Sequence, residues 1–331
     1  MKLSIIVPVY NGEKFINRCY NSLMNQQLDD FDYEILFVDN NSIDNSIKII
    51  KQLATLNAKV KLISQPRQGE AQARNKGIET AKGDYLYQLD VDDEVFPNVL
   101  KHMIKVMDAH KDVEAVFGKM LKTDKTLATF SEELEETHKL IFEQKPFWGL
   151  KWFSNLGTVV GEGAFMHRKS VFAKVGTYTE QLPIIGTDLA FDIKLGMTCN
   201  IVFMDTYIYL YFKHEISLIQ GVKKKMPRAF MVWPRLVKEH LSLYLENDTP
   251  SKFKSLLFSQ LFQSMGRQLV FTDGFAKRKR LKGQLMSDLR DIHIPFSIRF
   301  YLTILVILPL EMLRKIYGYY LVPYTVKKLI K

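Results

Sequence analysis

The sequence predicts an α/β protein with a mostly parallel central sheet, followed by a helical extension. Three observations support this prediction. From residue 1 to about residue 119, apolar runs of strand length alternate with segments of helical periodicity, as in consecutive βαβ units. Each apolar run ends in polar residues. Beyond residue 220 the chain is helical in pattern, basic and aromatic to its end.

Four apolar runs are the predicted strands, at residues 4–7, 34–38, 60–64 and 85–89. Between them, apolar residues recur at roughly helical spacing, in the sets Phe15, Ile16, Cys19 and Leu23; Ile47, Ile50 and Leu53; and Ala73, Ile78 and Ala81. In a parallel sheet, ligands bind at the carboxyl ends of the strands. The unusual polar residues of this sequence stand at those ends, so we expect the functional site there.

The net charge favours an anionic partner. The 331 residues include 46 Lys+Arg and 36 Asp+Glu, a net charge of +10, which suits a nucleoside diphosphate, an anionic membrane surface or nucleic acid. No helix-turn-helix, zinc-finger or RNP signature is present, so a nucleic-acid partner is not expected. The absence of G-x-G-x-x-G after the first strand disfavours an oxidoreductase. A nucleotidyltransferase is disfavoured because no glycine-rich loop opens the chain.

Cysteine usage and apolar runs bear on the compartment. Cys19 and Cys199 are far apart and lack metal-ligand spacing, so neither a disulfide framework nor a zinc site is predicted. This fits a reducing cytoplasm. The first apolar run is interpreted as a buried strand and not as a signal peptide. The apolar stretch at residues 300–310 is too short for a membrane-spanning helix, which needs about 20 residues.

The most specific local signal is an acidic cluster of Asp90, Asp92 and Asp93, directly after the fourth predicted strand. Crowded carboxylates repel one another unless a cation neutralises them, and hard oxygen ligands suit Mg²⁺ or Mn²⁺. Such a cation would bridge the carboxylates to phosphates. The alternative is a solvated turn in which Asp92 or Asp93 caps a helix that starts near Val95.

Three further polar motifs follow the other strands: Pro8-Val-Tyr-Asn11, Val38-Asp-Asn-Asn-Ser42 and Gln68-Gly-Glu-Ala-Gln-Ala-Arg-Asn75. Together with the acidic cluster, they make residues 2–220 resemble the family 2 glycosyltransferases of the GT-A fold. The resemblance implies a GT-A domain at residues 1–220, with a nucleotide-sugar-binding half (1–119) and an acceptor-binding half (120–220). Residues 221–331 then form a helical, basic and amphipathic C-terminal region.

The resemblance also implies an activity. Such an enzyme transfers a sugar, with inversion, from a nucleoside-diphosphate sugar to a hydroxyl of a glycan or lipid-linked glycan in surface polysaccharide synthesis. A UDP-sugar is the favoured donor, and Mn²⁺ or Mg²⁺ the expected cofactor. The rival interpretation is a catalytically inactive nucleotide- or carbohydrate-binding module, because Asn40 and Thr187 depart from the family pattern.

By the same resemblance, the base and ribose of the donor contact four residues: Pro8, Tyr10, Glu13 and Asp39. Asn40 replaces the second Asp of the family motif, and an amide can donate where a carboxylate only accepts, which leaves the nucleobase open.

The acidic cluster and the arginine of the third motif receive roles in the same way. Arg74 matches the arginine near the diphosphate, where it pairs with phosphate or with the acidic cluster, and a surface helix arginine is the alternative. Asp90 is implied at the ribose and Asp92 at the metal. Asp93 shares or takes over the metal role.

A general base is also required, because a sugar hydroxyl is a poor nucleophile until its proton is removed. The segment Ile185-Gly-Thr-Asp-Leu-Ala-Phe191 resembles the family's Glu-Asp-x-x-Phe segment and gives this role to Asp188, with Thr187 in place of the usual Glu. Two alternatives stay open. Asp188 caps a helix over residues 189–196, or Asp192 is the functional acid.

The segment Tyr211-Phe-Lys-His-Glu-Ile-Ser217 looks like the family's Tyr-Arg-x-His-x-x-Ser segment, which closes over the diphosphate. It implies that Lys213 pairs with phosphate and that His214 binds the metal. A structural histidine is the alternative. His167 is expected to line the acceptor pocket. The acidic run at residues 132–136 is interpreted as a solvated helix face without a chemical role.

Basic clusters interrupt the apolar segments beyond residue 220, at residues 223–225, 277–280 and 326–331. The stretch at residues 296–309 and the tyrosines beyond it suit a membrane interface beside anionic headgroups. The alternative is a helical subdomain packed on the first domain or on a second protomer in an oligomer. The expected location is the cytoplasm, with peripheral association at the inner face of the cell membrane.

Overall fold

The computed structural model of the 331-residue chain describes residues 1–130, 139–180, 187–214, 234 and 250–329. The chain divides into two compact units, Met1–Gly221 and Val222–Lys331. The acidic run at residues 132–136 and the lysine cluster at residues 223–225 lie outside the described residues.

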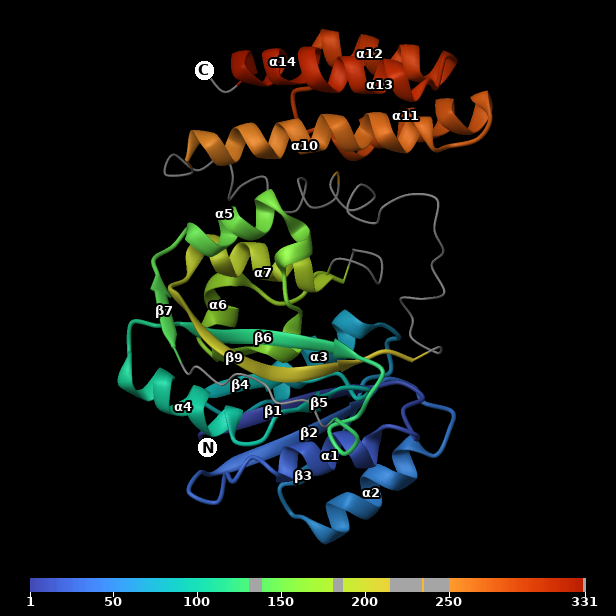
Figure 1. Ribbon diagram of the computed structural model, residues 1–331. Coiled ribbons are helices and arrows are strands. Elements are labelled where there is room, and N and C mark those ends of the chain that lie inside the picture. The colour runs from blue at the N-terminus through green and yellow to red at the C-terminus, as the bar shows by residue number, and fades with distance from the viewer. Residues whose placement is uncertain (131–138, 181–186, 215–233, 235–249, 330–331) are drawn as a thin grey trace. The chain divides into compact units, whose positions relative to one another are not determined.

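The amino-terminal half of the first unit is a series of βαβ crossovers (Figure 1). Its elements are β1 (Leu3–Val9), α1 (Ile16–Met24), β2 (Tyr33–Asp39), α2 (Ser46–Leu56), β3 (Val60–Ser64), α3 (Glu70–Thr80) and β4 (Tyr85–Gln88). These four strands pair in parallel in the order β3-β2-β1-β4. All four were predicted, with ends within two residues, because each is an apolar run bounded by polar residues.

The second half of this unit extends the sheet. Its elements are β5 (Glu94–Val95), α4 (Val99–Ala109), β6 (Ala115–Thr123), β7 (Leu140–Glu143), α5 (Phe147–Ser154), η1 (Leu156–Thr158), η2 (Glu162–Ala164), β8 (Phe165–Arg168), α6 (Val171–Val175), α7 (Thr187–Thr198) and β9 (Ile201–Phe212). Over the described residues, the sheet order is β3-β2-β1-β4-β8-β6-β9-β5, and β7 pairs with β9. The strand β8 is antiparallel to both β4 and β6.

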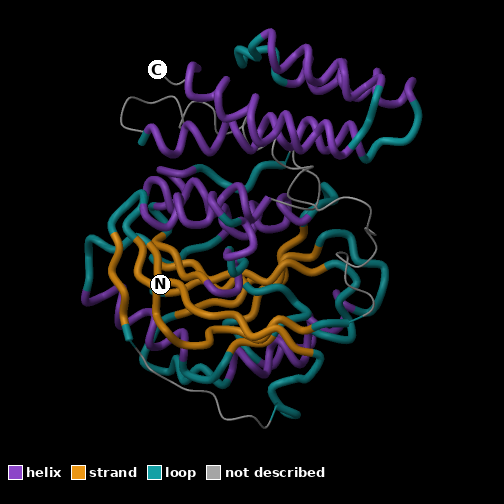
Figure 2. The backbone as a smooth tube through the Cα atoms, turned by 45° about the horizontal axis from the view of Figure 1, so that its top comes forward, coloured by secondary structure: helices purple, strands orange, loops and turns teal. Residues whose placement is uncertain are grey.

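Helices cover both faces of this sheet, as Figures 1 and 2 show. The approach of α3 is close, because a Cβ atom on Gly77 would lie 2.3 Å from Cγ2 of Ile6 in β1. Glycine therefore lets α3 sit directly on the sheet. This contact sets the distance from the sheet of α3 and therefore of Arg74, which lies one turn earlier on that helix. The mostly parallel sheet between helices confirms the predicted fold class.

The carboxy-terminal unit is helical where it is described. Its elements are α10 (Ser251–Val270), α11 (Phe275–Asp288), α12 (Phe296–Ile307), α13 (Glu311–Ile316), the π-helical turn η3 (Tyr317–Leu321) and α14 (Val322–Leu329). Phe253, Leu257 and Leu261 of α10 are buried, as are Tyr301 and Leu305 of α12. Among the described helices, none combines the length and the apolar character that crossing a bilayer requires.

Candidate active site

The carboxyl ends of β1, β2 and β4 lie side by side because the strands are parallel neighbours. Pro8 is in register with Val38, and Val9 with Asp39. The backbone N–H of Asn40 donates to the carbonyl of Val9 at 2.8 Å. The polar motifs that follow these strands are thereby brought to one edge of the sheet, where a parallel sheet binds its ligands.

The residues expected at the donor base and ribose form the outer part of this edge. Tyr10 is exposed, and Pro8 is half-buried. Asp39 is buried, and its Oδ1 accepts the Ser42 N–H at 3.3 Å, which shapes the turn after β2. The Glu13 carboxylate accepts both the backbone and the side-chain N–H of Asn45, at 3.0 and 2.8 Å. Glu13 thus anchors the start of α2.

Asn40 has a structural explanation. Its side-chain amide donates to the carbonyls of Gln65 and Arg67, at 2.8 and 2.7 Å, and its Oδ1 accepts the Gly69 N–H at 2.7 Å. Asn40 therefore ties the turn after β2 to the loop that leads into α3. A carboxylate could not make the two donations. Asn40 is buried and engaged, so the departure from the family motif is explained by the scaffold.

The acidic cluster forms a tight turn after β4, in which the Asp93 N–H donates to the Asp90 carbonyl at 3.0 Å. Asp93 is buried, and its Oδ1 accepts the Phe212 N–H at 2.9 Å. Burial, followed by the charges of Asp92 and Asp90, raises the pKa of Asp93. The helix-cap alternative is wrong, because Glu94 and Val95 form the short strand β5.

Arg74 pairs with the acidic cluster and not with solvent. Only 2% of its side chain is exposed, and its Nη2 lies 2.6 Å from Asp90 Oδ1 and 2.9 Å from Glu70 Oε1. Burial alone would lower the pKa of Arg74, but the carboxylates of Asp90 and Glu70 raise it. The surface-arginine alternative is therefore wrong.

Asp90 is the carboxylate of the acidic cluster that pairs directly with Arg74. Its side chain is 43% exposed, so a ligand can reach it. Partial burial raises its pKa to about 7, against the lowering effect of Arg74. Glu70, Asp92 and Asp188 add to the rise. Asp188 belongs to α7, so a charge on that helix acts on Asp90.

Asp92 and His214 meet above the turn. Asp92 Oδ2 lies 2.8 Å from His214 Nε2, and the imidazole packs against the rings of Phe15 and Phe212. The neighbouring Lys213 is exposed, and its backbone N–H donates to Thr123 at 2.8 Å. The end of β9 is thus brought back to the turn after β4.

Asp188 lies in the first described turn of α7 and is half-buried. Its charge contributes to the raised pKa values of Asp90, Glu162 and Asp192. Asp188 therefore lies close enough to these three carboxyl groups for its charge to affect them. Asp192, its open alternative, is fully buried one turn later.

His167 does not line an open pocket. It is fully buried in β8 and contacts the rings of Phe165, Phe172 and Phe191. Burial lowers its pKa to about 3. The expectation that it lines the acceptor pocket is wrong, because His167 is a neutral member of an aromatic core.

The expected Mn²⁺ or Mg²⁺ needs oxygen or nitrogen ligands near the turn after β4. Among the described residues, no three His, Cys, Asp or Glu side chains converge as a ready-made metal cage. Mg²⁺ is commonly held by one or two carboxylates together with substrate phosphates. Asp92, with 31% of its side chain exposed, and the adjoining His214 fit that second arrangement.

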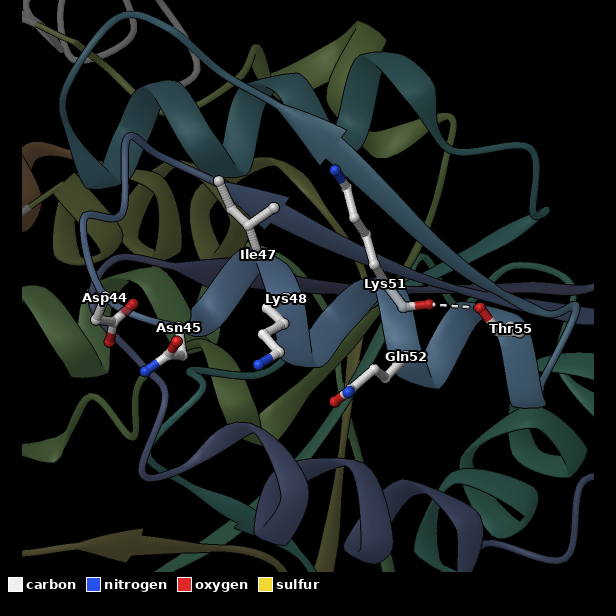
Figure 3. Close-up of a pocket in the computed structure, with 7 residues that line it drawn as sticks. All are labelled: Asp44, Asn45, Ile47, Lys48, Lys51, Gln52 and Thr55. Carbon is white, nitrogen blue, oxygen red and sulfur yellow. Dashed lines mark hydrogen bonds between the residues drawn. The ribbon is translucent and has the colours of Figure 1, made fainter.

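A pocket of ≈ 520 Å³ lies elsewhere, along α2 (Figure 3). Its lining residues are Asp44, Asn45, Ile47, Lys48, Lys51, Gln52 and Thr55. None of them belongs to the carboxylate cluster. The chemistry of the strand ends, and not the size of this depression, identifies the candidate active site.

The chain folds as an α/β domain with a cluster of carboxylates at its strand ends, and residues 4–173 match the model of Glycosyl transferase family 2. The chain belongs to this family. It is similar to the putative glycosyltransferase EpsH of Bacillus subtilis (strain 168), with 28% identity over 239 residues. That match covers 68% of this chain and 64% of EpsH, so the chain spans less than two thirds of that relative.

Two solved structures share the fold. Staphylococcus aureus TarS 1–349 in complex with UDP-GlcNAc has a TM-score of 0.65 at 18% identity, covering 96% of this chain and 91% of that one. The mannosyltransferase PcManGT from Pyrobaculum calidifontis, in complex with GDP-Man and Mn²⁺, has a TM-score of 0.54 at 15% identity. The match covers 99% of this chain and 87% of the PcManGT chain.

Three residues of the site were not found from the sequence. Arg18 donates to the Asp92 carbonyl at 2.5 Å, and its guanidinium lies 4.0 Å from the centre of the Phe212 ring. Tyr178 and Glu162 lie beside Arg74. Arg18 stands on the amphipathic α1, where a polar residue is ordinarily solvated. Glu162 and Tyr178 belong to no motif, so no local signal identified them.

Proposed function

We propose that the chain transfers a sugar, with inversion, from a nucleoside-diphosphate sugar to a hydroxyl of a glycan or lipid-linked glycan. A UDP-sugar is the favoured donor, and surface polysaccharide synthesis is the process. The observation that carries the proposal is the ion pair of the buried Arg74 with Asp90, beside Asp92, at the carboxyl edge of the sheet. Asp188 of α7 is close enough for its charge to raise the pKa of Asp90. The TarS complex, which contains UDP-GlcNAc, gives further support.

In this proposal the donor lies along the strand ends. Tyr10 and Pro8 contact the nucleobase, and Asp39 with Asp90 binds the ribose. Glu13 acts mainly by holding the start of α2 through Asn45. Arg74, which is almost fully buried, keeps the Asp90 carboxylate in place for the ribose hydroxyls.

Asp92 and His214 would hold Mn²⁺ or Mg²⁺, and Asp93 would support the turn from below. When bound, such a cation supplies positive charge that stabilises the leaving diphosphate. Lys213 provides a second positive charge from the end of β9. Arg18 keeps the backbone of this turn in position through the Asp92 carbonyl.

Asp188 is the proposed general base. It takes the proton from the acceptor hydroxyl as the oxygen attacks the anomeric carbon, while the bond from that carbon to the diphosphate breaks. A single in-line displacement of this kind inverts the configuration and needs no covalent sugar intermediate. Asp188 stands on α7, whereas the residues proposed at the leaving group stand on the segments after β4 and β9.

The first experiment is calorimetric titration of the full chain with UDP, GDP and TDP, each with and without Mn²⁺, on the wild type and on Asp92→Asn. Tight binding of one diphosphate that needs both Mn²⁺ and Asp92 supports the proposal. If none of the three diphosphates binds, the donor site assignment fails, and the inactive binding-module interpretation moves ahead for a different ligand.

We also propose that the carboxy-terminal unit attaches the protein to an anionic membrane surface on the cytoplasmic side. Phe296 is 81% exposed, and Tyr319 and Tyr320 are similarly open. Exposed Lys327 and Lys328 follow on α14. Aromatic rings beside lysines suit the headgroup region of anionic lipid.

Sedimentation with vesicles tests this attachment. Wild-type protein should bind vesicles of phosphatidylglycerol and not of phosphatidylcholine, and Phe296→Ser with Tyr320→Ser should reduce that binding. If the wild type binds neither vesicle type and sediments by itself as an oligomer, the exposed aromatic surface of the carboxy-terminal unit is an interface between protomers. The membrane proposal is then wrong.

A further inference from the structure

Two buried carboxyl groups lie beneath the cluster and have no place in the reaction as described. Glu162 of η2 is 3% exposed, and Asp192 of α7 is completely buried. Their carboxyl groups interact with each other. No side-chain oxygen of either residue closes a hydrogen bond of normal geometry. Buried polar atoms in this condition are uncommon and call for an explanation.

The charges around the pair do not balance if both groups are ionised. The groups that act on the Glu162 carboxyl are Arg74 of α3, Asp90 after β4, Tyr178 after α6, and Asp188 with Asp192 on α7. Arg74 is the one cation in this set, and its Nη2 is already paired with Asp90 and Glu70. Two uncompensated buried carboxylates are strongly unfavourable, and neighbouring carboxyl groups relieve the repulsion by sharing a proton.

The pair is also placed to hold the reacting groups. Asp192 lies four residues after Asp188 on the same helix, so both project from nearby positions on one face of α7. Arg74 Nη1 is buried without a hydrogen-bond partner, on the guanidinium whose other nitrogen holds Asp90. The Tyr178 hydroxyl accepts from Gln88 Nε2 at 2.7 Å, which leaves its own proton for an acceptor such as Glu162.

We propose that Glu162 and Asp192 are positioning residues that share one proton. The hydrogen bond that this shared proton makes joins η2 to α7 and keeps Asp188 at a fixed place relative to Arg74 and Asp90. The inference rests on the proposed role of Asp188 as the base. When the pair loses its proton at high pH, two carboxylates repel each other and the first turn of α7 shifts. Burial, which raises the pKa of Glu162 to about 7, agrees with a proton held near neutrality.

Substitutions at Glu162 test the positioning role through kcat and pH. In Glu162→Gln, the amide donates permanently to Asp192, so kcat at pH 7 should stay within about threefold and the alkaline fall of activity should diminish. In Glu162→Ala the link is lost, and kcat should fall about 10-fold or more because the base is misplaced. UDP affinity and the KM for the donor should change much less in both. Glu79→Gln, an exposed substitution of the same kind on α3, is the control.

Equal activity of Glu162→Ala and wild type would overturn the positioning role. An unchanged alkaline fall in Glu162→Gln would overturn the shared proton. Stability against pH separates this inference from the proposed function. Between about pH 5 and pH 7, the free energy of unfolding of the wild type should decrease more steeply with pH than that of Glu162→Gln. The difference in slope should correspond to about one bound proton, or about 1.4 kcal/mol per pH unit. If the wild type transfers no sugar but this difference is measured, the pair stands and the assignment of Asp188 falls. If the two proteins titrate alike, the pair itself is wrong.

Discussion

Nε2 of His214 lies 2.8 Å from Oδ2 of Asp92, although the two residues are 122 positions apart in the chain. The contact joins the end of β9 to the turn after β4, and it is held by the packing of the imidazole on Phe15 and Phe212. A carboxylate and an imidazole at this separation are suited to bind one divalent cation between the protein and a diphosphate.

The first prediction concerns His214. Replacement by Ala should weaken Mn²⁺-dependent binding of UDP by about 10- to 100-fold, because one metal-side contact is removed. Binding in the absence of Mn²⁺ should change little. Calorimetry measures both, and His293→Ala, at an exposed position in the carboxy-terminal unit, is the control. Equal Mn²⁺ dependence in His214→Ala and wild type would show that the histidine is structural.

The second prediction separates the base from the donor site. Asp188→Asn should lower kcat by about 10²- to 10⁴-fold, because the amide cannot accept the acceptor's proton. Its affinity for UDP with Mn²⁺ should match that of the wild type, whereas Asp92→Asn should lose both transfer and metal-dependent binding. Asp84→Asn, an exposed carboxylate before β4, provides a matched control. Normal turnover by Asp188→Asn would refute the base assignment.

The third prediction concerns Asn40. The substitution Asn40→Asp removes two donations, to the carbonyls of Gln65 and Arg67, and leaves both carbonyls beside a carboxylate. The free energy of unfolding should fall by about 1–3 kcal/mol. Urea denaturation measures this loss, and Asn17→Asp on the exposed side of α1 should cost much less. A stability equal to wild type would mean that these bonds contribute little.

The fourth prediction is a pH dependence of stability. His167 has its pKa lowered to about 3 by burial, so the folded state resists a proton that the unfolded state takes up near pH 6.5. The contribution of His167 to the free energy of unfolding is therefore fully present above pH 6.5. It is lost as the pH falls below that value, at about 1.4 kcal/mol per pH unit. His167→Phe should remove this acid sensitivity between pH 6 and pH 4. Parallel stability curves for the two proteins would place a charged histidine in the core and contradict the prediction.

The parallel strands were predictable because each is a short apolar run with polar ends, and that pattern is local. The position of β8 between β4 and β6 was not, because a strand's apolar pattern does not identify its partners. The acidic cluster was likewise visible in the sequence. Which carboxylate faces solvent was not, since the burial of Asp93 depends on the Phe212 N–H from a strand far along the chain.

The same limit explains the residues around Arg74. Its position on a helix after β3 follows from local periodicity, but its pairing with Asp90 depends on the close packing of Gly77 on Ile6. Glu162 and Tyr178 reach the site through the folding of segments that carry no motif. Sequence alone therefore predicted the position of Arg74 on a helix, but not the residues that the fold gathers around it.

The pairing of β8 with both β4 and β6 has a consequence for engineering and for divergence within the family. A swap of the segment that contains β8 cannot stop at the loops, because β8 is hydrogen-bonded to β4, the strand that precedes Asp90. A chimaera that imports η2 and β8 from a relative must also import compatible residues in β4 (Tyr85–Gln88). Otherwise β8 will not pair with β4 in the correct register. The half of the domain proposed to bind the acceptor is thus tied by backbone hydrogen bonds to β4, the strand that leads into the acidic cluster.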